Sequence, residues 1–217
     1  MKQITKYNVS NSLRRIFLYH GLLTRLSAMG VTRVFSHTLA DESGVTAEQV
    51  RKDFSEYHLR GHRRGGYSTE DLLSDMEALF NRDRVSNIIL VGMGNLGQAL
   101  ARYQQLEQRA INVVATFDVD PHKQKIHHDV QVYSMGRLDE IIERFRVKVA
   151  ILTVPDISAQ EVCNELVNAG VRGIVNFSPV LLKVPHYVVV NNVNLGDEIE
   201  SIIWSVQKMR EGQTLSL

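Results

Sequence analysis

Gly92-Met93-Gly94-Asn95-Leu96-Gly97 is the stretch that decides the fold of this chain. The apolar run at residues 88–91 before it predicts a β-strand, and the run at 99–103 after it is typical of a helix. Asp118 stands 21 residues beyond Gly97, at the end of a second apolar strand. A glycine triplet between a strand and a helix, with an acid at this distance, indicates a dinucleotide-binding βαβ unit.

Each position of this motif has a physical reason. Gly92 permits the tight turn, Gly94 lets a pyrophosphate approach the backbone, and Gly97 lets the helix pack on the strand. The start of the helix offers free N–H groups to the phosphates, and Asp118 is expected to accept hydrogen bonds from the ribose hydroxyls. Asp120 adds a second carboxylate that would repel a 2′-phosphate, so we expect NAD or NADH rather than NADP. The alternative is a glycine turn that binds nothing, and the position of Asp118 argues against it.

Beyond Asp118, strands and helices alternate in the pattern of a doubly wound parallel sheet, the Rossmann fold. We expect strands at residues 130–132, 147–154, 173–175 and 187–190, and helices at 138–145, 159–169 and 195–209. Ligands of such sheets bind at the carboxyl ends of the strands, so the turns at 153–155 and 176–179 are expected at the nicotinamide end. These turns offer Thr, Pro, Asn, Phe and Ser rather than a positioned acid or base. This composition favours a site that binds the coenzyme without turning it over.

The last expected helix carries more apolar surface than a terminal helix needs to cover its own domain. Ile199, Ile202 and Ile203 share one face, and Trp204 adds a large ring. Such a surface favours contact with a partner subunit.

Composition bounds the class of protein. The chain has 217 residues, of which 44% are hydrophobic and 23% charged, as is typical of a soluble protein with one large or two small domains. It contains no apolar run of membrane-spanning length and no secretory leader, so we expect a cytoplasmic protein without a membrane partner. Cys163 is expected to be a core residue. His127-His128-Asp129 lacks the spacing of a metal site and is interpreted as a surface loop, and no metal site is predicted.

The net charge of +1 hides an asymmetry between the two ends of the chain. Residues 1–67 contain 11 Lys and Arg against 5 Asp and Glu, a net charge of +6, whereas residues 68–217 contain 14 against 19, a net charge of −5. A basic segment joined to an acidic remainder favours contact between the basic segment and a polyanion.

The pattern inside the basic segment predicts a helix-turn-helix. We expect a helix at 12–29, a second at 37–43 capped by Ser36, and a third at about 47–57. Gly44 ends the second helix. Thr46 and Gln49 have the spacing of a capping box, in which the Gln49 side chain reaches back to the cap.

The third helix has an apolar and a polar face. Val50, Phe54 and Tyr57 are expected to pack on the other helices, whereas Glu48, Arg51, Lys52 and Ser55 are expected on one exposed face. Side chains of these types at a helix N-terminus reach base edges or phosphates in the major groove, and Gln49 is suited to pair with adenine or to contact the backbone. A solvated helix face is the alternative.

The loop after the third helix favours DNA binding over a solvated helix face. Residues 60–67, Arg-Gly-His-Arg-Arg-Gly-Gly-Tyr, are rich in glycine and in cations. They are expected to form the wing of a winged helix, because glycines let the backbone enter a narrow minor groove and arginines meet its negative potential. Thr69 is expected to cap a linking helix at 70–81, with a domain boundary at 82–84.

Several stretches, in this order, resemble the Rex family of redox-sensing transcriptional repressors over nearly the whole chain. They are Gln49-Val50-Arg51-Lys52-Asp53, residues 92–97, Phe117-Asp118-Val119-Asp120-Pro121, Thr153-Val154-Pro155 and Asn176-Phe177-Ser178-Pro179. The resemblance implies a homodimer of winged-helix and Rossmann domains whose C-terminal helix is exchanged between subunits. It implies a repressor that binds a pseudo-palindromic operator in double-stranded DNA and releases it when NADH accumulates relative to NAD⁺.

The chain departs from the family pattern at a few positions. Gly21 and Asn194 stand where the family has Arg and Asp, which in the family contact the tyrosine that matches Tyr103. His58 stands where the family has a glycine, and the wing sequence also differs.

From the motifs and the resemblance together we expect a winged-helix domain at residues 1–82, a Rossmann domain at 83–193 and a dimerisation helix at 194–217. The expected coenzyme-binding residues are Gly92, Met93, Gly94, Asn95, Leu96, Gly97, Tyr103, Asp118, Val119, Asp120, Lys123, Thr153, Val154, Pro155, Asn176, Phe177 and Ser178. The expected DNA-binding residues are Arg15, Thr46, Gln49, Arg51, Lys52, Ser55, Arg60, His62, Arg63 and Arg64. No catalytic residue is expected.

Two other functions remain open on the sequence. One is an NAD-dependent oxidoreductase with a basic appendage, for which NADH turnover with a carbonyl substrate is the distinguishing observation. The other is a nucleotide-gated scaffold that uses its N-terminal domain for protein contacts. Failure of the protein to bind duplex DNA would favour the scaffold.

Overall fold

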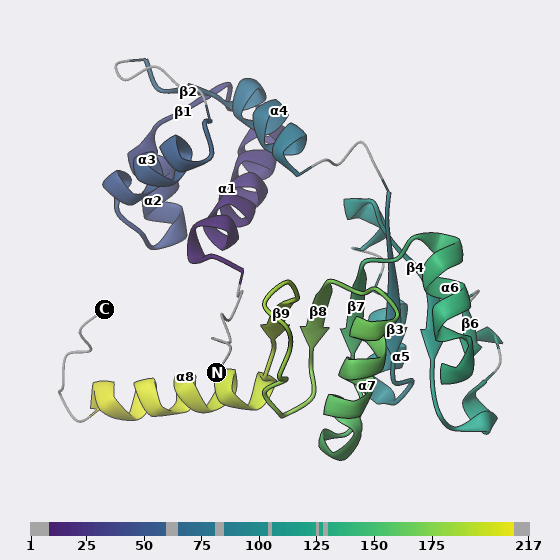
Figure 1. The fold of residues 1–217 in the computed structure, drawn as a ribbon. Coiled ribbons are helices and arrows are strands. Elements are labelled where there is room, and N and C mark those ends of the chain that lie inside the picture. Colours follow the sequence, from purple (N-terminus) through teal and green to yellow (C-terminus); the bar gives the residue numbers. More distant parts are fainter. Residues whose placement is uncertain are drawn as a thin grey trace. The chain divides into compact units, whose positions relative to one another are not determined.

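A computed structural model describes residues 9–59, 65–80, 85–103, 106–124, 126–127 and 130–210, which divide into two compact units (Figure 1). The smaller unit comprises residues 9–85, and the larger unit contains the chain from Ser86 onward.

The smaller unit is a winged helix. Its elements are α1 (Asn11–Ala28), β1 (Arg33–Val34), α2 (Ser36–Ser43), α3 (Ala47–Glu56), β2 (Tyr67–Ser68) and α4 (Thr69–Leu79). β1 and β2 pair antiparallel, with Arg33 opposite Ser68. The apolar faces of the helices meet in a core that includes Ile16, Leu23 and Phe54. The structure confirms the three predicted helices and adds β1, which the sequence analysis missed because two residues are too few to show alternation.

Two predicted helix caps in this unit were wrong. The N-cap of α2 is Phe35, without a side-chain bond, and Ser36 is the first helical residue. Ser68 rather than Thr69 caps α4, and its Oγ accepts a hydrogen bond from the Asp71 N–H. Because the β1–β2 pairing ends at Ser68, α4 begins at Thr69, one residue earlier than predicted.

The larger unit is a doubly wound sheet, as predicted. Its strands are β3 (Ser86–Val91), β4 (Ile111–Phe117), β5 (Ile126–His127), β6 (Val130–Tyr133), β7 (Val149–Leu152), β8 (Gly173–Asn176) and β9 (Val189–Asn192). Its helices are α5 (Asn95–Ala101), α6 (Leu138–Phe145), α7 (Asp156–Asn168) and α8 (Leu195–Arg210), with short 3₁₀ turns η1 (Glu107–Arg109), η2 (Pro121–Lys123) and η3 (Met135–Arg137).

The strand order in the sheet is β5-β6-β4-β3-β7-β8-β9, and every neighbouring pair except β5–β6 is parallel. The chain goes from β3 to β4 on one side and later returns to β7 on the other. The order therefore reverses at β3, and ligands of such sheets bind beside the strand ends at this point.

Alternate residues of β3 face opposite layers of helices, because successive side chains of a strand point to opposite faces. Ile89 and Val91 lie in the core formed with α6 and α7, whereas Ile88 and Leu90 lie in the core that Leu100 of α5 joins. Figure 1 shows α6 and α7 on one face of the sheet and α5 on the other. Burial on both faces explains the continuous apolar run of β3.

Several predicted boundaries shift. β7 is shorter than the predicted 147–154, and β9 begins at Val189 rather than at residue 187. In the turn before β9, the Val188 N–H donates to the carbonyl of Pro185, which keeps residue 187 outside the strand. His127 lies in β5, which pairs with β6, and not in the predicted loop; residues 128–129 lie outside the described part.

Helix α8 extends away from the sheet (Figure 1). Its large apolar side chains are exposed within this chain: Leu195, Ile199, Ile202, Ile203, Trp204, Val206 and Met209. No helix of the described residues is long and apolar enough to cross a membrane.

Candidate functional site

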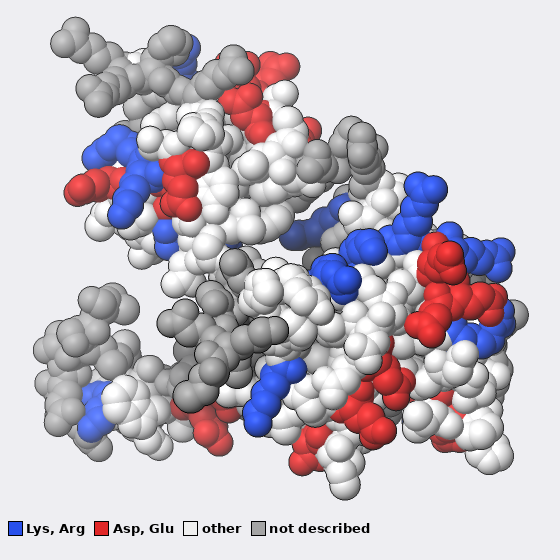
Figure 2. Space-filling view, in the orientation of Figure 1, with Lys and Arg blue, Asp and Glu red and all other residues white. Residues whose placement is uncertain are grey.

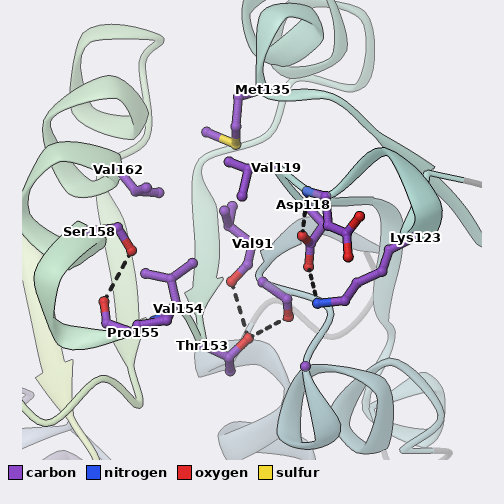
Figure 3. A pocket seen from close by; sticks show the side chains of 13 residues that line it. Val91, Asp118, Val119, Lys123, Met135, Thr153, Val154, Pro155, Ser158 and Val162 are labelled. Atoms are coloured by element: carbon purple, nitrogen blue, oxygen red, sulfur yellow. Dashed lines mark hydrogen bonds and ion pairs between the residues drawn. The ribbon is translucent and has the colours of Figure 1, made fainter.

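A cavity of about 500 Å³ opens at the carboxyl ends of β3, β4 and β7, where the strand order reverses (Figure 3). Nine predicted coenzyme residues line it: Gly92, Gly94, Asp118, Val119, Asp120, Lys123, Thr153, Val154 and Pro155. The cavity also contains Val91, Met135, Ser158 and Val162, which the sequence analysis did not assign.

The glycine loop closes tightly on its own backbone. Gly92 has a φ of +102°, and a Cβ built there would lie 2.7 Å from the carbonyl oxygen of Thr153. A Cβ at Gly97 would collide with the carbonyl oxygen of Gly92. At Gly94, by contrast, a Cβ would meet no atom within 4 Å. Gly92 and Gly97 are therefore required by packing, whereas Gly94 borders open space that suits the approach of a pyrophosphate.

Thr153 holds this loop from the neighbouring strand. Its hydroxyl donates to the carbonyl oxygen of Gly92 at 2.7 Å, and its N–H donates to the carbonyl of Val91 at 2.9 Å. The Thr153 hydroxyl is thus used to fix the loop, while the residue still borders the cavity.

Asp118 joins the glycine loop to the end of β4. This residue is 7% exposed, and its carboxylate accepts hydrogen bonds from the N–H of Met93 at 2.7 Å and of Asp120 at 2.9 Å. Lys123 Nζ lies 3.3 Å from Asp118 Oδ2. A carboxylate has about four acceptor sites, so one remains for a ribose hydroxyl.

Lys123 reduces the negative charge that Asp118 and Asp120 place at this end of the cavity. Asp118 and Asp120 give this end of the cavity two negative charges, and the ammonium of Lys123 offsets one of them. Figure 3 shows Asp118 and Lys123 together at one end of the cavity. The preference for NAD over NADP stays a prediction.

The other end of the cavity is mainly apolar. Val154, Pro155 and Val162 line it, and the Ser158 hydroxyl donates to the carbonyl of Pro155 at 3.1 Å. Among the described lining residues at this end, no ionisable side chain is placed to transfer a proton. This composition suits an uncharged ring better than a reaction that needs an acid or base.

The side chains of Asn176 and Ser178, predicted to contact the coenzyme, form hydrogen bonds within the protein instead. The Asn176 amide nitrogen donates to the carbonyl of Val180 and to Asn192 Oδ1, both at 2.8 Å, and the Ser178 hydroxyl donates to the carbonyl of Val154 at 2.6 Å. Both residues are buried. Their side chains therefore build the turn after β8.

The remaining predicted coenzyme residues lie around the cavity rather than among its lining residues. Met93 is buried under the loop and Phe177 packs on the core beside α5. Asn95 and Leu96 are exposed at the start of α5, and Tyr103 is exposed after its end. Of the missed residues, Met135 had a signal, because it lies two residues after the carboxyl end of β6.

The winged helix presents the predicted polar face of α3. The exposed residues of this face line a shallow hollow of about 850 Å³ between α3 and β2; they are Glu48, Arg51, Lys52 and Ser55. In Figure 2, Lys and Arg side chains project over the region of α2 and α3, next to acidic ones. Thr46 caps α3, as predicted, and accepts a hydrogen bond from the Gln49 N–H at 3.1 Å. Arg51 is held by the Ser36 hydroxyl at 3.0 Å.

Arg15 and Gln49, two of the predicted DNA contacts, both bond the buried carboxylate of Asp53. Arg15 makes two hydrogen bonds to Asp53, from Nε at 2.6 Å and from Nη2 at 2.7 Å. The Gln49 amide nitrogen also donates to Asp53, at 2.8 Å, so it does not reach back to complete the predicted capping box. The Arg15–Asp53 pairing could not be predicted from the sequence, because a pairing across 38 residues leaves no local pattern.

The predicted wing contacts Arg60, His62, Arg63 and Arg64 lie outside the described residues. Directly before β2, Gly66 has a φ of +71°, and a Cβ there would lie 2.7 Å from the Val34 carbonyl oxygen. The backbone at the start of β2 therefore requires this glycine.

The departures from the family pattern have structural counterparts. His58, which replaces a glycine, has a φ of 55° in the left-handed region. Gly21 borders open space on α1. Asn194 caps α8 through its Oδ1, which accepts from the Gly196 N–H at 3.0 Å.

No cluster of three or more His, Cys, Asp or Glu suited to a metal occurs among the described residues. Cys163 is buried in α7, as predicted, and burial raises the pKa of its thiol to about 11. Such a thiol is protonated and unreactive at neutral pH.

Comparisons with known proteins find matches to both units of the chain. Residues 10–55 match the family described as "Putative DNA-binding protein N-terminus", and residues 83–180 match the family described as "CoA binding domain". A redox-sensing transcriptional repressor Rex of Oenococcus oeni is 38% identical over 89% of this chain and 90% of its own length. The corresponding repressor of Streptococcus pneumoniae is 35% identical over 90% of this chain and 93% of its own length.

Solved structures show the same likeness. RSP, a Rex-family repressor, in complex with NADH superimposes with a TM-score of 0.82 at 33% identity, covering 93% of this chain and 96% of RSP. RSP in complex with NAD⁺ and operator DNA superimposes with a TM-score of 0.85, also at 33% identity, covering 95% of this chain and 99% of RSP.

Proposed function

The chain belongs to the Rex family of redox-sensing transcriptional repressors, and we propose on this premise how its two sites work together. It is a DNA-binding repressor that senses the NADH/NAD⁺ ratio and releases its operator when NADH binds. It is not an oxidoreductase, in keeping with the repressors that it resembles over nearly its whole length.

The single observation that carries this function is the presence of both sites in one chain. A capped recognition helix with an exposed polar face, α3, precedes a sheet whose carboxyl edge holds a glycine loop and a buried acid. The residues fit a dinucleotide, because Gly94 leaves open space beside the loop and Asp118 keeps an acceptor site for a ribose hydroxyl. When bound, the nicotinamide ring supplies the redox difference that the protein senses.

The protein's own residues orient the coenzyme. Asp118 and Lys123 hold the adenosine end, the glycine loop faces the pyrophosphate, and Val154 and Pro155 border the nicotinamide end. With an apolar lining at that end, oxidised and reduced rings differ in their fit because only one carries a positive charge, and burying an unpaired charge is costly. Such differential affinity is what a switch requires.

A homodimer would transmit this difference to DNA. The exposed apolar side chains of α8, among them Ile203 and Trp204, suit burial against a second copy of the chain, with α8 exchanged between subunits. We assign residues 1–82 to DNA binding, 83–193 to coenzyme binding and 194–217 to dimerisation. Two recognition helices about 34 Å apart would fit half-sites one helical turn apart. Such a repressor acts in the cytoplasm of a bacterium.

DNA contacts are expected from the exposed face of α3 and from the wing. Arg51 and Lys52 would contact phosphates or base edges, with Thr46 and Ser55 beside them, and Arg63 and Arg64 would enter the minor groove.

Substitutions in the coenzyme site need a control of their own. Asp139→Ala, on the exposed side of α6 and away from the lining of the cavity, is that matched control.

The experiment is a gel shift on upstream DNA from the same genome, with NADH and NAD⁺ varied separately. We expect NADH to release the DNA and NAD⁺ to leave it bound. Replacing both Arg63 and Arg64 with Ala is expected to weaken DNA binding and flatten its salt dependence. Unchanged affinity of that variant would remove both arginines from the DNA surface.

A further inference from the structure

Asp53 is a carboxylate buried inside the DNA-binding unit, on the recognition helix α3. Its side chain is 0% exposed. Its oxygens accept hydrogen bonds from Arg15 twice, from the Tyr19 hydroxyl at 3.0 Å and from the Gln49 amide at 2.8 Å. Two of these donors belong to α1, whereas Gln49 belongs to the first turn of α3 itself.

This carboxylate stays charged. Burial raises the pKa of Asp53, but the hydrogen bonds from Arg15, Gln49 and Tyr19 together outweigh burial and leave the pKa below its ordinary value. The bond to Asp53 in turn raises the pKa of the Arg15 guanidinium. The buried group at the base of the recognition helix is therefore a permanent acceptor at neutral pH.

A permanent acceptor fixes the orientation of the Gln49 amide. Only the NH₂ end of an amide can face a carboxylate, because its carbonyl end would place one acceptor against another. The carbonyl oxygen Oε1 must then point away from Asp53. Gln49 is half-buried at the border of the exposed face, and Lys52 and Glu48 lie beside it on the exposed side.

An amide fixed in this way presents a defined edge. Nε2 has two N–H groups, of which Asp53 takes one, so a second donor and the acceptor Oε1 are left for a ligand. One donor beside one acceptor matches the N7 acceptor and the N6 amino group of adenine in the major groove. The N-terminal residues of a recognition helix are the ones that contact base edges.

We propose that Gln49 recognises an adenine of the operator and that Asp53 is the positioning residue that sets the direction of its amide. This inference rests on the proposed function. It assigns Arg15 to the fold, as the counter-ion of Asp53, and leaves phosphate contacts to Arg51 and Lys52.

The test begins with selection from random-sequence duplexes by the full-length protein, without NADH. Wild type, Gln49→Ala and the control Glu70→Ala, an exposed acidic residue on α4 rather than on α3, are compared. We expect wild type and Glu70→Ala to enrich adenine at one position of each half-site, and Gln49→Ala to lose that preference while it keeps the rest of the motif. An unchanged motif in Gln49→Ala would overturn the inference but leave the proposed function intact. Failure of wild type to select any motif would overturn both.

The second measurement needs no variant of Asp53 and identifies the contacted atom. The selected adenine is replaced by 7-deazaadenine, which lacks the N7 acceptor. Wild type is expected to lose affinity about tenfold, and Gln49→Ala is expected to lose none. Equal loss in both proteins would contradict a bond from Gln49 to N7.

Asp53→Asn tests the positioning role. A side chain that only supports the fold would lower affinity equally for all duplexes. A positioning residue lowers the ratio of affinities between the adenine duplex and a guanine duplex, because the amide of Gln49 is then free to turn. We expect the ratio to fall toward that of Gln49→Ala, and an unchanged ratio at lower overall affinity would contradict the assignment.

Discussion

Replacing Arg15 with alanine tests whether this side chain belongs to the fold or to the DNA surface. Arg15 lies on α1 and was among the residues predicted to contact DNA. In the structure its guanidinium meets both oxygens of Asp53, at 2.6 and 2.7 Å. The variant removes two charge-assisted hydrogen bonds and leaves a buried carboxylate with two neutral donors, Tyr19 and Gln49.

The size of the effect follows from burial. Removing one partner of a buried ion pair costs about 3–5 kcal/mol, because the other charge stays buried without compensation. Asp53 is 0% exposed but Arg15 is 24% exposed, so water can enter beside the truncated side chain and reduce the cost. We therefore expect the winged helix to lose about 2–3 kcal/mol of its free energy of unfolding, which corresponds to a factor of about 30–140 in the opening equilibrium.

Hydrogen exchange measures this unit separately from the rest of the chain. The slowest amides of α1 and α3 are expected to exchange faster by about that factor in Arg15→Ala, while the strands of the sheet unit keep their rates. Arg25→Ala is the matched control, because Arg25 is exposed on the same helix and its favourable interaction with the helix C-terminus is worth about 1 kcal/mol or less.

A role of Arg15 at the DNA surface predicts a different result for the same variant. If Arg15 contacts a phosphate, its removal leaves hydrogen exchange unchanged and lowers the slope of log K against log salt by about 0.9 per lost phosphate contact. Unchanged exchange together with a lower slope would refute the structural role of Arg15.

Three further predictions concern the coenzyme site, pH and assembly. Asp118→Ala is expected to raise the dissociation constant of NADH at least about tenfold, because it removes the acceptor for the ribose and the hydrogen bond to the glycine loop. Calorimetry measures this constant, and the control Asp139→Ala should bind NADH as wild type does. The depressed pKa of Asp53 stabilises the winged helix above the pKa of the unfolded chain, so stability should be lost as the pH falls below about 4. Hydrogen exchange or circular dichroism against pH should show a smaller loss in Asp53→Asn, and an identical curve would contradict the role of this carboxylate. Ile203→Asp should convert a dimer into monomers in analytical ultracentrifugation, and an intact dimer would place the interface elsewhere.

The sequence predicted the architecture well where patterns are local. The spacing of Gly92, Gly94 and Gly97, followed by Asp118, predicted the βαβ unit, because each of these positions has its own steric or hydrogen-bonding reason. The capped recognition helix was predicted for the same reason, since Thr46 and the amide that it bonds are three residues apart.

The sequence could not predict which polar side chains have partners far along the chain. Arg15 was predicted to contact DNA, but its guanidinium bonds Asp53, 38 residues away. Asn176 was expected at the coenzyme because it ends a parallel strand, yet it bonds Asn192 on the next strand. In each case the three-dimensional neighbour decides the role, and periodicity carries no information about it.

The central claim is that one cavity, at the ends of β3, β4 and β7, controls the affinity of α3 for DNA. The most direct measurement is the operator affinity of the full-length protein at saturating NADH and at saturating NAD⁺, under the same salt concentration. We expect affinity to be lower with NADH by about 5- to 150-fold, the range of a coupling free energy of about 1–3 kcal/mol. Equal affinities with both coenzymes bound would contradict the claim, because a ligand that does not distinguish two states cannot shift them.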